Sequence, residues 1–383
     1  MKPISKRAAA MPAYQIREIM ELAWKTPDCI HLEVGQPNFF TPDYIGEAGI
    51  KAIKDGFTAY TSSRGIPELQ EAICVKVAQK NGFRATASNI TVCPGAVTAL
   101  ESAVMAIVNE GDEVLLPDPG WHNPKPMVDF LGAKSVPYTL WPDRGFLPDL
   151  AEMEGLITPS TKAIVINTPS NPTGAVFPQE LLEGIYQLAC KHDLYIISDE
   201  VYEDFVFDCT HFSIKSIDVE ERVLAIYGFS KSHAMTGWRL GYVIAPAEIS
   251  AVISKLQELL VSCASSISQK AAVAALKGPY DPVVKMRDAY QLRRDIALDI
   301  LRRYGLYEYT PDGAFYLMVN VSRLGSNSGE IAKQLLRETK VATAPGTAFG
   351  KSMLQHVRVS LAASEEDIRT GMERLCQAIT GQK

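Results

Sequence analysis

Short runs of aliphatic and β-branched residues alternate with helix-like stretches through the middle of the chain. Seven such runs lie between residues 89 and 245, bounded by Gly, Pro, Asn or Asp: NITVC, DEVLLP, KSVPYTL, KAIVIN, LYIISD, RVLAIY and LGYVIA. Runs of this kind are typical of strands that are covered on both faces. Residues 96–109 and 179–192 repeat apolar positions every three and four residues, which predicts helical crossovers. The pattern therefore predicts an α/β domain with a mostly parallel seven-stranded sheet.

The pattern changes at Asp281-Pro282. Asp and Pro are favoured where helices begin, and a charged amphipathic stretch continues from there to Gly305, which suits the position just beyond a helix end. We therefore expect one long helix to leave the large domain here. Further on, residues 307–320 predict two strands around a turn at Asp312-Gly313. A helix over residues 329–338, a strand over 356–362 and a last helix over 365–378 complete the chain.

Two folding units follow from this change of pattern, and the second is of the α+β kind. A chain of 383 residues is also more than one small core can absorb. We expect residues 1–45 to form an N-terminal arm and the first part of the small domain. Residues 46–281 would form the large domain, and residues 282–383 the connecting helix and the rest of the small domain.

The charge balance and the cysteines narrow the class of protein. With 38 basic and 44 acidic residues, the net charge of -6 does not favour binding to nucleic acid or to anionic lipid. The chain contains no apolar run long enough to span a membrane, and its first residues lack the apolar core of a signal peptide. Seven scattered cysteines without a CxxC pair argue against a disulfide framework and a metal site. We expect reduced thiols in a cytoplasmic protein.

The segment GFSKSHAMTGWRLGY, residues 228–242, holds the most informative chemistry. Lys231 follows a predicted strand in a stretch that is poor in charge, so its amine is expected to be partly desolvated and nucleophilic. Ser230 precedes it and Arg239 follows eight residues later. One short segment thus supplies an amine, a hydroxyl and a guanidinium, which is the set that a phosphorylated aldehyde requires.

This segment resembles the signature of the class I and II aminotransferases, the fold type I enzymes that use pyridoxal phosphate. The resemblance extends along the chain in the family's order, through VGQP, YTSSRG, CPGAVTAL, DPGWHN, NPTG, SDEVY and HVRVS. It implies a large cofactor-binding domain, a smaller α+β domain and a homodimer whose active sites lie at the interface. It also implies that Lys231 holds the cofactor as an imine and carries the proton during catalysis.

The resemblance assigns further roles to residues of these motifs. Asp199 ends a predicted strand, where it would hold the protonated ring nitrogen of the cofactor. Tyr202 and Asn171 would hydrogen-bond the phenolic oxygen of the cofactor and tune its imine. The remaining expected contacts are Gly95, Ala96, Val97, Ser230 and Arg239 at the phosphate, Tyr60 reaching the phosphate of the partner subunit, Trp121 stacked on the ring, and Gly35, Asn171 and Arg358 at the substrate.

The implied activity is transfer of an amino group from an L-amino acid to a 2-oxo acid. We expect aspartate or a broad range of donors, with 2-oxoglutarate as acceptor. A β-eliminating C-S lyase on the same fold is the alternative, and a ligand-sensing homologue without turnover is a distant one. A dicarboxylate donor needs a second cation, for which Arg64 and Lys125 are candidates because they lie close in sequence to Tyr60 and Trp121.

Two secondary expectations concern prolines and histidines. The bonds Asp118-Pro119 and Asn171-Pro172 match positions that are cis in family members, so we expect cis geometry at both. His122, His192 and His233 are expected to be structural or solvated residues, and of these only His233 lies near the lysine in sequence.

Overall fold

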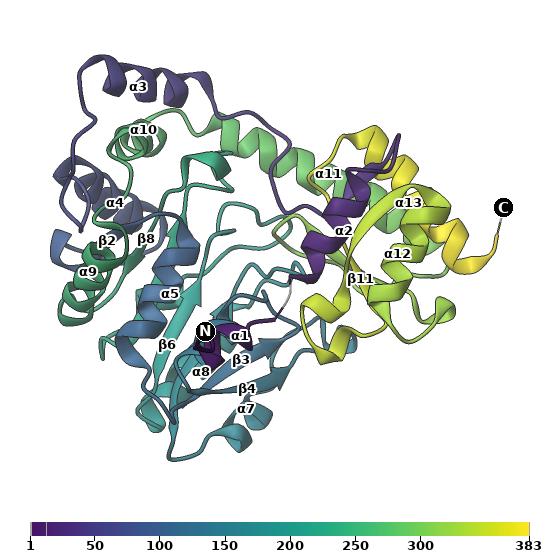
Figure 1. The fold of residues 1–383 in the computed structure, drawn as a ribbon, viewed down its shortest axis with the longest axis horizontal. Coiled ribbons are helices and arrows are strands. Elements are labelled where there is room, and N and C mark those ends of the chain that lie inside the picture. The colour runs from purple at the N-terminus through teal and green to yellow at the C-terminus, as the bar shows by residue number, and fades with distance from the viewer. Residues whose placement is uncertain (1, 13, 383) are drawn as a thin grey trace.

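A computed structural model describes residues 2–12 and 14–382 and contains two sheets (Figure 1). The larger sheet has seven strands in the order β2-β8-β7-β6-β5-β3-β4. β8 runs antiparallel to both of its neighbours, and the other adjacent pairs are parallel. All seven predicted strands are therefore confirmed. Their bounds are β2 Ile90–Cys93, β3 Glu113–Asp118, β4 Lys134–Thr139, β5 Thr161–Asn167, β6 Tyr195–Asp199, β7 Val223–Gly228 and β8 Gly241–Ile244.

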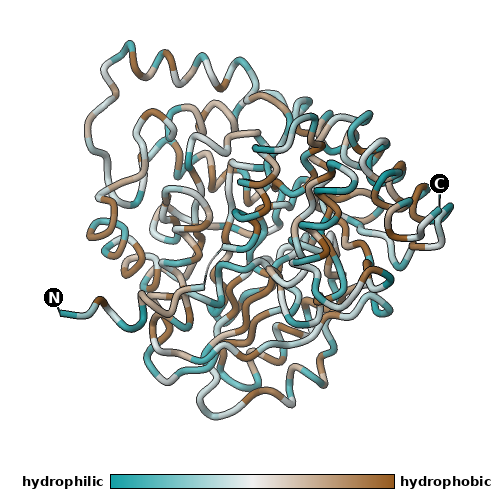
Figure 2. The backbone as a smooth tube through the Cα atoms, turned by 45° about the vertical axis from the view of Figure 1, so that its right-hand side comes forward, coloured by the Kyte–Doolittle hydropathy of each residue, from teal (hydrophilic) through white to brown (hydrophobic). Residues whose placement is uncertain are grey.

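Helices cover both faces of this sheet, which explains why its strands are apolar throughout. Successive residues of a strand point to opposite faces, and on β6 Ile196 joins one apolar cluster while Ile197 joins another. One face packs against α5 (Ala96–Ile107), α6 (Pro124–Phe130) and α9 (Ala247–Val261). The other face packs against α3 (Asp43–Lys54), α4 (Pro67–Lys80), α7 (Leu150–Leu156), α8 (Gln179–Lys191) and α10 (Ser266–Lys277). Figure 2 shows the apolar strands gathered in the interior.

The smaller sheet joins the two ends of the chain. Its order is β1-β10-β11-β9, with β1 parallel to β10 and the other pairs antiparallel. In Figure 1 the purple helix α2 lies among the yellow-green elements of the C-terminal part. The bounds of these strands are β1 Ile30–Leu32, β9 Tyr316–Asn320, β10 Val341–Pro345 and β11 His356–Ser360. The helices are α1 Lys6–Ala9, α2 Gln15–Ala23, α11 Asp281–Arg303, α12 Ser328–Thr339 and α13 Glu365–Thr380.

One predicted strand is wrong. Residues 307–320 contain only one strand, β9, because the first half of the segment makes its backbone hydrogen bonds elsewhere. The amides of Asp312 and Gly313 both donate to the carbonyl of Gly174, and the Ala314 amide donates to the carbonyl of Phe205. This half of the segment therefore joins the small sheet to loops of the large one.

A second tie between the two sheets starts at the end of β3. The carboxylate of Asp118 accepts hydrogen bonds from the backbone amides of Lys351 and Ser352, each at 3.1 Å.

The domain boundaries predicted at residues 45 and 281 stay a prediction, although the long helix α11 does begin at Asp281. Over residues 2–12 and 14–382, no helix has the length and apolar character required to cross a membrane.

Candidate functional site

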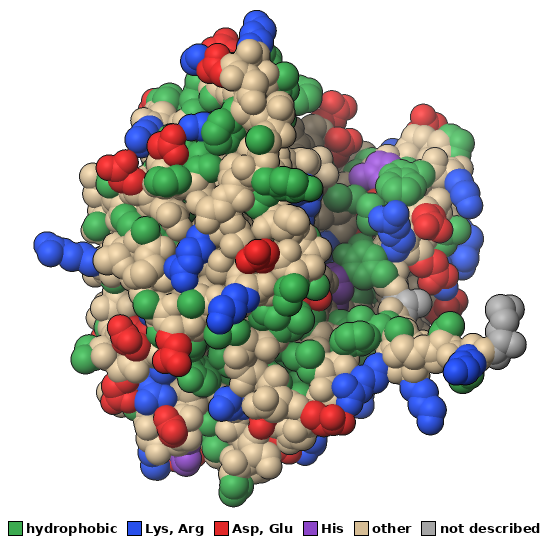
Figure 3. Space-filling view, turned by 60° about the vertical axis from the view of Figure 1, so that its left-hand side comes forward, with side chains coloured by type: hydrophobic (Ala, Val, Ile, Leu, Met, Phe, Trp, Pro, Cys, Tyr) green, Lys and Arg blue, Asp and Glu red, His purple; other side chains and the backbone are tan. Residues whose placement is uncertain are grey.

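A cavity of about 380 Å³ opens at the carboxyl ends of β5, β6 and β7 and extends to α2 and β11. Figure 3 shows the surface hollowed between the larger and the smaller part of the molecule. Ligand sites of open α/β sheets are expected at this edge. Most of the predicted site residues line the cavity: Gly35, Ala96, Val97, Trp121, Asn171, Asp199, Tyr202, Ser230, Lys231, Arg239 and Arg358.

Lys231 follows β7 and reaches into the centre of the cavity. Its Nζ donates to the carbonyl oxygen of Gly35 at 2.7 Å. Burial, together with the charges of Arg358 and Arg239, lowers the pKa of the Lys231 ammonium to about 8, against the opposing charge of Asp199. A neutral amine is therefore accessible near physiological pH, as nucleophilic lysine chemistry requires.

Asp199 is the last residue of β6 and is buried. Burial and the neighbouring Glu200 raise the pKa of this carboxyl group to about 7, although the backbone amide of Val201 and the charge of Lys231 lower it. The Val201 amide donates to Asp199 Oδ1 at 3.3 Å. A cationic ring nitrogen beside this carboxyl group would favour its ionised form, so the pair would stabilise each other's charges.

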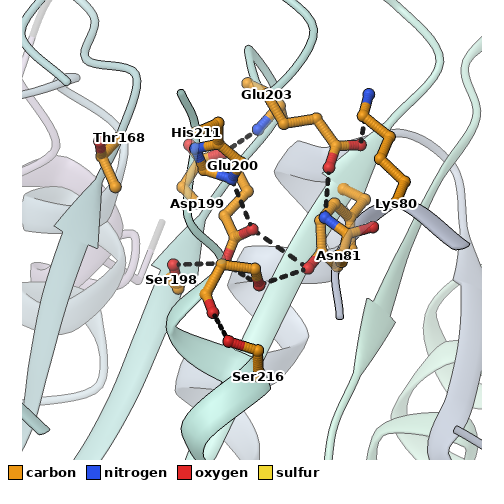
Figure 4. Close-up of polar contacts among 12 residues, drawn as sticks. Lys80, Asn81, Thr168, Ser198, Asp199, Glu200, Glu203, His211 and Ser216 are labelled. Carbon is orange, nitrogen blue, oxygen red and sulfur yellow. Dashed lines mark hydrogen bonds and ion pairs between the residues drawn. The ribbon is translucent and has the colours of Figure 1, made fainter. Parts of the chain in front are cut away.

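Glu200 lies behind Asp199 in a buried polar network (Figure 4). Its two oxygens accept hydrogen bonds from the hydroxyls of Ser198 and Ser213, both at 3.0 Å, and of Tyr227 at 3.1 Å. His211 Nε2 lies 3.0 Å from the same carboxylate. The network holds the Glu200 charge in place beside Asp199.

Glu203, one turn further along, belongs to the same network. It accepts a hydrogen bond from the Asn81 amide at 2.6 Å and forms ion pairs with Lys76 and Lys80. Potential ligand atoms of Glu200, Glu203 and His211 lie within 4.8 Å of one another. Hydroxyl donors and two ammonium groups already occupy the surroundings that a metal cation would need, so we assign no metal to this cluster.

The expected phosphate end of the cavity is formed where α5 begins. Gly95 precedes the helix with a φ of 90°, and Arg239, also at positive φ, packs directly against it. A Cβ atom at Gly95 would lie 2.6 Å from a guanidinium nitrogen of Arg239. Gly95 itself is not part of the cavity wall, which Ala96, Val97 and Ser230 form. A helix N-terminus beside a guanidinium and a hydroxyl can bind a phosphate group.

Arg358 forms the opposite end of the cavity and is only 3% exposed. It donates to Asn171 Oδ1 at 2.8 Å and to the carbonyl oxygen of Glu33 at 2.6 Å. Its Nε has no hydrogen-bond partner among the described residues. A buried guanidinium that is held by neutral oxygens retains its charge for a carboxylate ligand.

The cavity-wall residues that the sequence analysis did not single out include Asn167, Tyr316 and Arg17. Asn167 accepts from the Asn171 amide at 2.7 Å and donates to the Asp199 carbonyl at 3.1 Å, so it holds two predicted site residues in place. Tyr316, on β9, contacts Tyr202 through a hydroxyl–hydroxyl hydrogen bond of 2.8 Å. Arg17, on α2, is the third. The first two belong to runs that were interpreted only as strands.

The expectation that His122 is merely structural or solvated needs correction, because His122 lines the cavity next to Trp121. Burial and the charge of Arg358 together lower the pKa of His122 to about 4, so the ring is neutral at physiological pH. The other two histidines conform to expectation. His192 binds Glu154 near the surface, and His233 is buried against Phe229.

The two candidate cations for a second carboxylate do not line the cavity of their own chain. Arg64 donates to the carbonyl of Ser88, and Lys125 forms an exposed ion pair with Asp129. Neither is part of the cavity wall. Tyr60 is 87% exposed and borders a separate hollow. Sequence proximity to Tyr60 therefore does not bring a side chain to this cavity.

Both predicted cis peptide bonds are confirmed. Asp118-Pro119 and Asn171-Pro172 are cis, and Thr168-Pro169, which was not predicted, is cis as well. The first precedes Trp121, and the other two lie in the loop that carries Asn171.

The donor set fits the cofactor that the sequence analysis implied. A lysine with a lowered pKa, a buried carboxyl group and a helix N-terminus with an arginine face one cavity. The absence of a side chain at Gly95 allows the Arg239 guanidinium to pack against the start of α5. These residues could hold the aldehyde, the ring nitrogen and the phosphate of pyridoxal phosphate, respectively.

Comparison with known proteins agrees with this chemistry. A family model described as aminotransferase class I and II matches residues 27–378. The aspartate/prephenate aminotransferase of Thermus thermophilus is 37% identical over 386 residues, which cover 99% of each chain. The aspartate aminotransferase of Pyrococcus abyssi is also 37% identical, over 99% of each chain.

Solved structures give the same result. The structure of Thermus thermophilus aspartate aminotransferase with maleate matches with a TM-score of 0.94 at 37% identity, and covers 98% of this chain and 100% of that one. The aromatic aminotransferase from Pyrococcus horikoshii matches with a TM-score of 0.90 at 37% identity, over 96% of this chain and 99% of that one.

Sequence, fold and cavity thus agree along nearly the whole chain. The relatives carry the names of aminotransferases, which favours amino transfer over the C-S lyase and the ligand-sensing homologue. The chain therefore belongs to the class I and II aminotransferases, the fold type I transaminases that depend on pyridoxal phosphate.

Proposed function

We propose that this transaminase uses a dicarboxylic amino acid, aspartate or glutamate, as its preferred donor and 2-oxoglutarate as its acceptor. The observation that carries the proposal is Arg17. The cavity wall contains four basic residues, of which Lys231, Arg239 and Arg358 have the amine, phosphate and α-carboxylate roles assigned above. Arg17 has no such role, and it extends from α2 to the same cavity.

The surroundings of Arg17 suit a second carboxylate. Its side chain is 63% exposed, and its Nε lies 4.0 Å from Glu21, which is the outer limit of an ion pair. Tyr14 lines the same cavity: burial raises the pKa of its hydroxyl, whereas Arg358 and Arg17 both lower it. A substrate with two carboxylates could therefore contact Arg358 with one and Arg17 with the other.

The proposed division of labour follows the geometry of the cavity. Lys231 binds the cofactor aldehyde through its nitrogen, and after release this nitrogen takes the proton from the substrate α-carbon. Arg358 orients the α-carboxylate, and Asp199 keeps a proton on the ring nitrogen. When bound, the cofactor supplies a conjugated ring that accepts the electrons released with the α-proton. Asn171 and Tyr202 donate hydrogen bonds at the phenolic oxygen.

Half-reactions test the substrate proposal. Aspartate and glutamate should convert the bound cofactor to its amine form faster than alanine or leucine does, as followed by absorbance. Arg17→Gln should raise the KM for aspartate about 10- to 100-fold, which is the size of one charged hydrogen bond. The KM for alanine should stay unchanged in this variant.

Glu21→Gln is the matched control, because it alters the same exposed face of α2 without removing the cation. It should leave both KM values unchanged. If Arg17→Gln affects aspartate and alanine equally, or affects neither, Arg17 does not select dicarboxylates. Uniformly better conversion of neutral donors would contradict the dicarboxylate proposal itself.

We also propose a homodimer in which Tyr60 reaches the phosphate in the partner subunit. Tyr60 is highly exposed, and Leu259, Leu260 and Val261 nearby in the fold are exposed as well, which is typical of a surface that another chain covers. Mixing Lys231→Ala with Tyr60→Ala protein should then restore activity, because one hybrid site contains both wild-type residues. Mixtures without activity would contradict shared sites.

The seven free thiols support a reducing, cytoplasmic location.

A further inference from the structure

Tyr316 presents a buried hydroxyl to the cavity next to Lys231 and Tyr202. It lies on β9, in the small sheet, whereas Tyr202 follows β6 of the large sheet. The two hydroxyl oxygens are 2.8 Å apart, and both side chains are buried. Burial raises the pKa of both hydroxyls, so both remain protonated at physiological pH. One of them must therefore donate to the other.

Packing fixes the Tyr316 ring without help from its hydroxyl. The guanidinium of Arg358 lies 4.3 Å from the ring centroid, and the ring of Phe315 lies 4.7 Å away. On the other side the backbone of Gly35 approaches so closely that a Cβ atom there would lie 2.2 Å from the Tyr316 hydroxyl oxygen. A phenylalanine would keep the contacts of the ring with Arg358 and Phe315, so these contacts alone do not explain the hydroxyl.

The same contacts connect Tyr316 to the reactive amine. Gly35, against which the hydroxyl packs, accepts the hydrogen bond from Lys231 Nζ at 2.7 Å. Lys231 Nζ also lies 5.8 Å from the centroid of the Tyr202 ring. Tyr316, Tyr202, Gly35 and Lys231 thus form one continuous group around the place where the cofactor would be joined.

We propose that Tyr316 is a positioning residue whose hydroxyl donates to Tyr202, turns the Tyr202 O–H toward the cofactor, and thereby weakens the hold of the Lys231 nitrogen on its proton. The inference rests on the roles of Lys231 and Tyr202 proposed above. A donor at the phenolic oxygen withdraws negative charge from it, and the nearby nitrogen then binds its proton less tightly. A hydroxyl that accepts one hydrogen bond is a stronger donor in the next.

Other charged groups also act on the Lys231 nitrogen. Arg358 on β11 and Arg239 lower its pKa, and Asp199 on β6 raises it. Tyr14, just before α2, raises the pKa of the Tyr316 hydroxyl. All four remain in place when only the Tyr316 hydroxyl is removed, so a comparison with the parent protein isolates that hydroxyl.

A spectroscopic pH titration tests the proposal without any substrate. The absorbance of the protein loaded with pyridoxal phosphate is recorded against pH, and its midpoint reports the proton on the Lys231 nitrogen. Tyr316→Phe should raise this midpoint by about half a pKa unit, the contribution of one neutral hydrogen bond expressed as a proton equilibrium. Tyr316→3-fluorotyrosine retains the shape and is a stronger donor, so it should lower the midpoint.

Two further variants decide whether the effect passes through Tyr202. In a Tyr202→Phe background, Tyr316→Phe should produce no additional change of the midpoint. Tyr309→Phe is the matched control: this buried hydroxyl donates to the carbonyl of Thr173 and accepts from the Met318 amide of β9, each at 2.8 Å, and it lies outside the cavity wall. It should leave the midpoint where it is.

The proposal is overturned if Tyr316→Phe leaves the midpoint unchanged or lowers it, since Tyr202 would then be the donor. It is also overturned if the change persists without the Tyr202 hydroxyl or if Tyr309→Phe reproduces it. A Lys231→Ala protein with the parent's titration would instead contradict the assignment of Lys231, which is a separate result.

Discussion

Replacing Lys231 by Met should stabilise the cofactor-free protein at neutral pH. Met retains most of the aliphatic stem and removes the ammonium. The pKa of Lys231 is about 8 in the folded protein and 10.5 in an unfolded chain, a gap that corresponds to about 3 kcal/mol. This value is an upper bound, because the residue borders the open cavity. Loss of the hydrogen bond to Gly35 offsets about 1 kcal/mol, so about 2 kcal/mol should remain.

The sign follows from proton linkage. Because folding lowers the pKa, the charged lysine destabilises the folded state fully below pH 8, and the penalty fades as the pH rises from about 8 to 10.5. The melting temperature of apo Lys231→Met should exceed that of the apo parent by about 2 °C at pH 7, for a chain of this size. At pH 10 most of the difference should be gone.

Thermal melting of both apoproteins at one concentration measures this. Lys125→Met is the control, since Lys125 is exposed and pairs with Asp129, a contact that contributes at most about 0.5 kcal/mol. If Lys231→Met is no more stable than the parent at pH 7, or if its advantage is as large at pH 10, the buried ammonium does not destabilise the folded protein as we expect.

Two other variants test the cavity. Asp199→Asn should still bind the cofactor, as judged by absorbance, but should lower kcat at least about 100-fold, because a neutral amide no longer keeps a proton on the ring nitrogen; a kcat near that of the parent would remove Asp199 from its role. Gly35→Ala should lower the melting temperature, because its Cβ atom meets the Tyr316 hydroxyl. Adding Tyr316→Phe should recover part of that loss, and failure to recover any would show that contact with this hydroxyl is not its cause.

The large sheet could be predicted because its strands are buried on both faces. β5 and β6 consist almost entirely of buried residues and therefore appear as continuous apolar runs. β1 could not be recognised, because it has three residues and its central His31 is exposed. β10 was missed as well. Its five residues include Pro345 at the end, and proline is uncommon in strands.

The residues of the candidate site could be predicted only where the sequence itself brings them together. Residues in motifs, such as Lys231 and Asp199, could be placed because their neighbours in sequence are also their neighbours in the cavity. Tyr316 and Arg17 could not, because only the packing of the small sheet and of α2 brings them there. Arg64 is a different case, since its proximity in sequence to Tyr60 does not place it in the cavity of its own chain.

The pairing of β1 with β10 has a consequence for biosynthesis. Ile30 pairs with Val341, so the first strand to leave the ribosome has no neighbour until almost the whole chain has been made. At about 5 to 20 residues per second, roughly 15 to 60 seconds pass in between. During that time the edge of β1 and the apolar side of α2, with Ile16 and Ile19, lack the partner that later buries them. Nascent chains should therefore depend on chaperones most in this interval, and slow translation should lengthen that dependence.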